Sequence, residues 1–252
     1  MSNQTKYLHC RVSGEGHPVI FLHGFLESMT MWNYLNFRLG FKHVYIDLPG
    51  HGRSTTKSET MVSILAMAKL VKATIDSLGV EEYHVVGHSM GGYVGLELIQ
   101  LDARCKKLVM LNSNFWSDEL KKQRDRRRVA NIVASNKTLF LYEAIPNLFL
   151  NPIKNDQVVQ DLIQEAGFID AQCIADVSIA MSKRNDLSHL ARELNKRILV
   201  IQGAEDAIVP VERMRGLQQK SEFVYKELQG CGHMAHIEKP NAVINVIEKF
   251  LK

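Results

Sequence analysis

Short apolar runs alternate with longer amphipathic stretches along most of the chain. The short runs predict strands, and apolar residues at helical spacing, as at Ile64, Ala68, Val71 and Ile75, predict helices between them. This alternation favours an α/β fold with a mostly parallel central sheet flanked by helices. The predicted strands are 7–12, 19–22, 44–47, 83–86, 107–111, 198–202 and 223–228, and the predicted helices between and after them are 61–78, 90–100, 211–219 and 241–251.

The alternation stops between Leu111 and Lys196, where no strand-like run occurs. We interpret this stretch as a helical cap inserted into one α/β domain, where it supplies apolar walls and excludes water from the chemistry beneath it. The predicted parts are the first part of the core at 1–113, the cap at 114–195 and the second part of the core at 196–252. Within the cap, helical patterns cover 118–135, 138–145, 156–165 and 171–181.

The most informative local sequence is the Gly-x-Ser-x-Gly motif centred on Ser89, which lies between a predicted strand and a predicted helix. Gly87 and Gly91 remove the Cβ atoms that would clash in a tight strand-to-helix turn. Such a turn exposes the Ser89 hydroxyl. It also leaves the Met90 backbone N–H at a helix N-terminus, where it can stabilise a developing oxyanion. The motif therefore predicts a nucleophilic serine.

A serine nucleophile needs an adjacent base that an acid orients, and in enzymes with this turn the acid and then the histidine follow along the chain. Asp206 follows the predicted strand 198–202, and the Gly-x-x-Asp spacing favours it over the neighbouring Glu205. His233 follows the last predicted strand, and its preceding glycine favours it over His236.

These motifs, in this order, resemble those of the α/β-hydrolase family over nearly the whole chain. The resemblance implies that fold, a Ser89–His233–Asp206 catalytic triad, and the Phe25 backbone N–H as a second oxyanion donor beside Met90. It implies no metal and no organic cofactor. The matching segments are VIFLHGF at 19–25, DLPGHGRS at 47–54, the Ser89 motif, GAED at 203–206, and Gly232 and His233 with Glu238 and Pro240.

Other residues near these motifs have simpler interpretations. His23 and His51 occupy loop positions where the family uses histidine structurally. His88, the variable position within the serine motif, is expected to pack or tune rather than react. Cys231 is expected to be a small buried thiol rather than a reactive one.

The resemblance implies a serine hydrolase that cleaves carboxylic esters of small or medium acyl groups through an acyl-enzyme. Thioesters, lactones and C–C bonds of diketones remain alternative substrates. A lyase similar to the menaquinone-pathway enzyme that eliminates pyruvate is a second alternative, although that family usually has arginine at the position of Tyr93. A non-catalytic ligand receptor is the third. Serine at position 89, where the superfamily's dehalogenases and epoxide hydrolases carry aspartate, argues against both of those activities.

Composition adds limits to this hypothesis. The chain has 252 residues, 46% of them apolar, and a net charge of +4, which fits one globular domain and gives no argument for a nucleic-acid partner. No apolar stretch approaches a membrane span, the first six residues lack the apolar core of a signal peptide, and the four cysteines are scattered. We therefore predict a cytoplasmic enzyme with a small-molecule acyl substrate, no nucleic-acid or membrane partner, and an oligomeric state that the sequence leaves open.

The densest charge cluster, Lys121 to Arg128, belongs to the first predicted cap helix. The simplest interpretation is a solvated helix face. Alternatively, arginines in this cluster bind a carboxylate or phosphate on the substrate, because guanidinium pairs with such groups bidentately.

Overall fold

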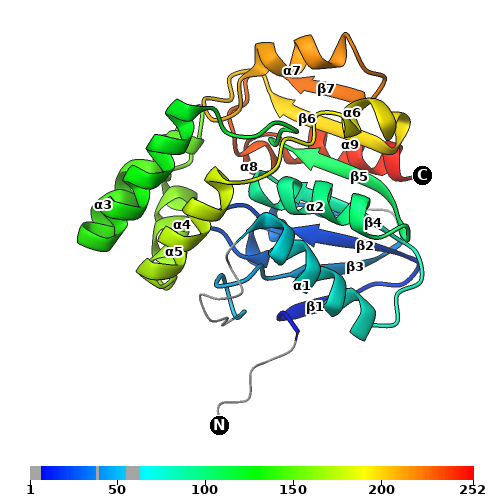
Figure 1. Cartoon of the computed structure of the whole chain (residues 1–252), viewed down its shortest axis with the longest axis horizontal. Coiled ribbons are helices and arrows are strands. Elements are labelled where there is room, and N and C mark those ends of the chain that lie inside the picture. The colour runs from blue at the N-terminus through cyan, green and yellow to red at the C-terminus, as the bar shows by residue number, and fades with distance from the viewer. Residues whose placement is uncertain (1–6, 38–39, 55–62) are drawn as a thin grey trace.

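The computed structural model describes residues 7–37, 40–54 and 63–252, and a seven-stranded sheet forms its centre (Figure 1). The strand order is β1-β3-β2-β4-β5-β6-β7. Only β1 is antiparallel to its neighbour, and every other pair is parallel. The predicted α/β class and mostly parallel sheet are therefore confirmed. The strands are β1 (Cys10–Ser13), β2 (His17–Leu22), β3 (Phe41–Ile46), β4 (Tyr83–His88), β5 (Cys105–Leu111), β6 (Ile198–Gly203) and β7 (Val224–Leu228).

Side chains alternate between the two faces of the sheet, and each face is covered by its own helices. Ile20, Val85 and Leu108 pack on one face, which α1 (Ile64–Ser77), α2 (Met90–Leu101) and α7 (Val211–Gln218) cover. Phe21 and Val86 pack on the other face, which η1 (Met29–Tyr34), α8 (Ala235–Glu238) and α9 (Pro240–Leu251) cover. Burial on both faces explains why the central strands consist of continuous apolar runs.

The seven strands occur where they were predicted, but their ends differ. β2 begins at His17 and β3 at Phe41, because the parallel ladder pairs these residues through the backbone whatever their side chains. β1 begins at Cys10 rather than at residue 7. The first two residues of the predicted helix 61–78 lie outside the described residues.

Between β5 and β6 the described chain is helical, and α3, α4 and α5 lie together on the side toward which the parallel strands point (Figure 1). The two helices predicted at 118–135 and 138–145 form one element, α3, with non-helical backbone at Asn136. The Asn136 side chain accepts a hydrogen bond from the Leu139 N–H (3.0 Å), as a helix N-cap does. No described helix is both long and apolar enough to cross a bilayer. The elements of the segment are α3 (Leu120–Ala144), η3 (Pro146–Leu148), α4 (Asp156–Gly167), α5 (Ala171–Ser182), α6 (Leu190–Glu193) and η4 (Asn195–Arg197).

The turn from β4 into α2 is packed too closely for side chains at its glycines. A Cβ on Gly87 would lie 2.4 Å from the Gly91 carbonyl oxygen, and one on Gly91 would lie 2.1 Å from the Leu22 carbonyl oxygen. Both contacts are with backbone, which cannot move aside cheaply. The expectation that Gly87 and Gly91 permit this turn is therefore confirmed.

We predict that Gly91→Ala lowers the free energy of unfolding by more than about 2 kcal/mol, because the new methyl group overlaps the end of β2. Gly216→Ala is the matched control: Gly216 lies within α7 and its added Cβ meets no atom within 4 Å. That change should stabilise the protein by roughly 0.5–1 kcal/mol. Urea unfolding of both variants measures the difference, and equal stabilities would contradict the packing argument.

Candidate active site

The loops that follow the parallel strands meet at one edge of the sheet, because parallel strands end on the same side. Ser89 follows β4, Asp206 follows β6 and His233 follows β7. The three residues are remote in sequence, and strand order alone places them near one another.

The structure brings Ser89, His233 and Asp206 into one hydrogen-bonded chain. The Ser89 hydroxyl donates to Nε2 of His233 at 2.9 Å, and the His233 Nδ1–H donates to both carboxylate oxygens of Asp206 at 2.9 and 3.0 Å. The His233 and Asp206 side chains are buried, whereas Ser89 is partly exposed. The serine can therefore be reached from solvent, and the groups behind it are shielded.

Asp206 is held by the backbone as well as by His233. Its Oδ1 accepts hydrogen bonds from the N–H groups of Ile208 (2.8 Å) and Val209 (3.0 Å). Burial alone would raise the pKa of Asp206, but the nearby His233 and these hydrogen bonds outweigh it, so the pKa lies below its ordinary value. The carboxylate is accordingly ionised at neutral pH.

Three polar residues that the sequence analysis did not single out support this chain. Asn112, buried at the end of β5, donates through Nδ2 to Asp206 Oδ2 (2.9 Å) and to the Gly232 carbonyl (3.0 Å). Ser113 donates its hydroxyl proton to the Ser89 carbonyl at 2.8 Å. Glu27 lies in the loop after β2 and contacts His88. The polar pair after the apolar run 107–111 was the one sequence feature that pointed to Asn112 and Ser113.

The predicted oxyanion donors lie on two neighbouring loops. Met90 is the first residue of α2, so its N–H has no acceptor within the helix. Ser89 before it has φ 47° and ψ −110°, a strained conformation for a residue with a side chain. Phe25 follows Gly24 in the loop after β2, and the next residue, Leu26, has φ 68°. The roles of Phe25 and Met90 as donors stay predictions.

The rival carboxylate and the rival histidine have other contacts. Glu205 accepts a hydrogen bond from the Cys231 N–H at 2.9 Å, which fastens the loop before His233. Among the described residues, neither ring nitrogen of His236 has a hydrogen-bond partner. Burial and the neighbouring His88 lower the pKa of His236 to about 3, so it stays neutral.

His23 and His51 make structural contacts. The His23 ring bridges its own loop to the next, bonding to the Gly24 carbonyl and accepting from the Leu48 N–H, both at 2.8 Å. His51 bonds to the Pro49 carbonyl at 3.0 Å. Burial raises the pKa of the Cys231 thiol to about 12, which fits an unreactive buried cysteine.

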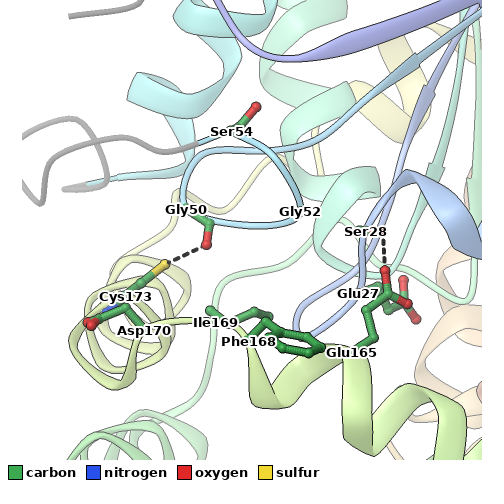
Figure 2. A pocket seen from close by; sticks show the side chains of 10 residues that line it. All are labelled: Glu27, Ser28, Gly50, Gly52, Ser54, Glu165, Phe168, Ile169, Asp170 and Cys173. Carbon is green, nitrogen blue, oxygen red and sulfur yellow. Dashed lines mark hydrogen bonds between the residues drawn. The ribbon is translucent and has the colours of Figure 1, made fainter.

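Two pockets lie among the loops and helices at this edge of the sheet. The first, about 450 Å³, lies between the loops after β2 and β3 and the helices α4 and α5 (Figure 2). Glu27 and Glu165 lie together on one side of it, with Phe168 beside Glu165, and Glu165 accepts a hydrogen bond from the Ser28 hydroxyl.

The second pocket, about 410 Å³, lies beside β5 and β6. Tyr93, one helical turn after Ser89, lines it together with Ile208, which follows the Asp206 loop. In the sheet, β4 lies between β2 and β3, whose loops line the first pocket, and β5 and β6, whose loops line the second. Ser89 itself lines neither pocket.

The basic cluster of α3 divides between solvent and this second pocket. Arg124, Arg127 and Arg128 are exposed, as the solvated-face interpretation expects. Arg126 differs: its side chain is 13% exposed, pairs with Asp118 at 3.1 Å and lines the pocket. Lys122 also lines it. No cluster of three or more potential metal ligands occurs among the described residues.

A model described as "Alpha/beta hydrolase family" matches residues 19–246 of the chain. The chain belongs to the alpha/beta hydrolase family. The match includes the loop of Phe25, the turn of Ser89 and the loops of Asp206 and His233.

Proteins similar to this chain carry the names of different activities. One is the dihydrolipoyllysine-residue acetyltransferase component of the acetoin cleaving system of Cupriavidus necator, which is 26% identical over 96% of this chain. This chain spans only 66% of that protein's length. Another is 3-oxoadipate enol-lactonase 1 of Acinetobacter baylyi, which is 26% identical over 100% of this chain and 95% of its own length.

Among solved structures, a thermophilic esterase from Thermogutta terrifontis, with malate bound, superposes with a TM-score of 0.88 at 26% sequence identity. The superposition covers 97% of this chain and 92% of the esterase. The fold is thus shared over 97% of this chain.

Proposed function

We propose that this protein is a serine hydrolase that cleaves carboxylic esters of small or medium acyl groups. The continuous hydrogen-bonded chain from Ser89 through His233 to Asp206 carries the proposal. Serine, histidine and aspartate in this order of contact are the groups that nucleophilic attack on an acyl carbon requires.

The reaction follows from this arrangement. Ser89 Oγ attacks the acyl carbonyl while His233 Nε2 takes its proton, and Asp206 stabilises the imidazolium that forms. The N–H groups of Phe25 and Met90 bind the oxyanion, each worth about 3–4 kcal/mol in such sites. His233 then protonates the leaving alcohol. Water cleaves the acyl-enzyme by the same route, and no cofactor enters the scheme.

The helical segment at 114–195 serves as a cap in this proposal. It supplies Phe168 and Ile169 to the first pocket and Trp116 to the second, which are the apolar walls that an acyl or alcohol group needs.

A lactone is the second candidate substrate. It is a cyclic ester that the same groups open, and the similarity to 3-oxoadipate enol-lactonase favours it. The pyruvate-eliminating lyase has less support, because Tyr93 stands at the position of that family's arginine. In this structure Tyr93 instead makes a cation–π contact, in which Cζ of the Arg184 guanidinium lies 4.1 Å from the centre of the Tyr93 ring.

A fluorophosphonate probe should label the folded protein at Ser89, because such probes trap an activated serine. Peptide mapping by mass spectrometry locates the label, and Ser89→Ala is the control that should stay unlabelled. A panel of p-nitrophenyl esters, thioesters and lactones should show turnover that the same variant abolishes. Labelling at another residue would overturn the assignment of the nucleophile.

Asp206→Asn should keep the fold but lower kcat by about 10⁴-fold, because the imidazole loses the charge that orients it. Glu205→Gln is the matched control and should stay within about threefold, since Glu205 contacts backbone rather than His233. An inactive Glu205→Gln beside an active Asp206→Asn would reverse the assignment.

The basic cluster gives a test of substrate charge. We predict that Arg127→Gln with Arg128→Gln changes turnover of neutral esters by less than about threefold, because these exposed charges are screened. Lys122→Gln with Arg126→Gln should stay within the same limit, because a neutral ester needs no cation from the pocket that these two residues line. The first pair is the exposed control for the second, which lines a pocket. A salt-sensitive loss in the second pair alone, confined to carboxylate-bearing esters, would show that this pocket binds anions.

A further inference from the structure

A second buried histidine–carboxylate pair lies directly behind the candidate triad. His88 is the last residue of β4, and its Nδ1 lies 3.0 Å from Glu27 Oε2. The two side chains are 1% and 3% exposed. The mechanism above uses neither residue.

The contacts of His88 fix its protonation state. Its second nitrogen, Nε2, lies 3.0 Å from the backbone carbonyl oxygen of His233. A carbonyl accepts hydrogen bonds only, and an ionised carboxylate also accepts only, so both nitrogens of His88 must carry protons. Burial alone would lower the pKa of His88, but the Glu27 carboxylate outweighs it and raises the pKa. Burial opposes ionisation of Glu27, yet the same pairing lowers its pKa to about 2. The pair is therefore an imidazolium with a carboxylate at neutral pH.

Glu27 also contacts the backbone of its own loop, the loop that follows β2. Its Oε2 also accepts a hydrogen bond from the Gly24 N–H at 2.5 Å, next to Phe25. Through these contacts the ion pair connects the proposed oxyanion loop, the strand that precedes Ser89 and the loop that carries His233. The His88 and His233 rings lie 5.1 Å apart.

We propose that Glu27 and His88 are positioning residues for the reaction, holding the His233 backbone and the Phe25 loop in register with Ser89. This inference rests on the proposed serine-hydrolase function. Stability is a weak reason for such a pair, since the desolvation of two buried charges offsets most of their attraction. The useful result is geometric: His233 is held by Asp206 at its ring and by His88 at its carbonyl.

The proposal predicts a distinct pH dependence. The charged or titratable groups that face His88 are Glu27, His233, His236 and Asp206, and His23 also faces Glu27. His23 and His236 have lowered pKa values and stay neutral, while Glu27 and Asp206 stay ionised. Above neutral pH, His88 therefore loses its proton and one of its two hydrogen bonds, and kcat should fall. Glu27→Gln removes the charge that raises the His88 pKa, so this alkaline fall should begin at lower pH.

The test measures kcat, KM and pH profiles on a p-nitrophenyl ester for Glu27→Gln, His88→Gln and the double variant. We expect each single variant to lose tenfold or more in kcat with KM within about threefold, because small displacements of a base are costly to the chemical step. The double variant should lose no more than the worse single variant. His9→Gln is the matched control: it breaks a histidine–carboxylate pair with Asp47, at 2.9 Å, and should change kcat and the pH profile little.

The outcomes separate the two proposals. If the wild type neither hydrolyses esters nor accepts the fluorophosphonate at Ser89, the proposed function fails. If the wild type is active but both single variants keep kcat within threefold and an unchanged pH profile, the pair is merely structural and this inference fails. If the variants do not fold, the rate at which the fluorophosphonate labels Ser89 in the wild type is measured against pH. The proposal expects this rate to fall at alkaline pH. A rate that stays constant up to the pH at which the protein unfolds overturns the proposal.

Discussion

The backbone of Ser89 is the constraint on which the rest of the site depends. Its φ of 47° is unfavourable for a residue with a side chain, and it persists because α2 packs against β2 and β4 at distances that only glycine allows. The Ser113 hydroxyl bonds to the Ser89 carbonyl and adds a further restraint. The strain is localised where it aims Oγ at His233, and the packed sheet prevents the turn from relaxing.

Strand order explains how residues so far apart in sequence reach this serine. β4 lies at the centre of the sheet, with β5 and β6 next to it on one side, so the Asp206 loop comes close to the Ser89 turn. Asn112 spans the remaining distance from the end of β5, bonding to Asp206 and to the backbone just before His233. The parallel sheet therefore supplies the approximate placement, and a few buried polar side chains supply the exact contacts.

The sequence predicted what has a local signature and missed what acts through a partner. The seven strands, the Gly-x-Ser-x-Gly turn and the break near Asn136 follow from apolar runs, glycines and polar interruptions. Asn112 and Glu27 resemble ordinary loop residues, because their importance lies in contacts with residues 94 and 61 positions away. Strand ends such as His17 were missed because pairing by the backbone ignores side-chain character. Arg126 shows the same limit: its neighbours in sequence face solvent, while an aspartate from outside the helix draws it inward.

The charges around His233 also require Glu27 to be present. An imidazolium at His88, with its ring 5.1 Å from that of His233, would repel the second positive charge that His233 would acquire on taking the serine proton in the proposed reaction. The negative charge of Glu27 offsets the positive charge of His88. The negative charge of Asp206 is therefore left to stabilise the protonated form of His233. A neutral imidazole at position 88 would avoid the repulsion, but it would have one proton fewer and could not donate to both the His233 carbonyl and Glu27. The buried pair thus allows a doubly donating side chain beside a histidine that itself becomes charged in the proposed reaction.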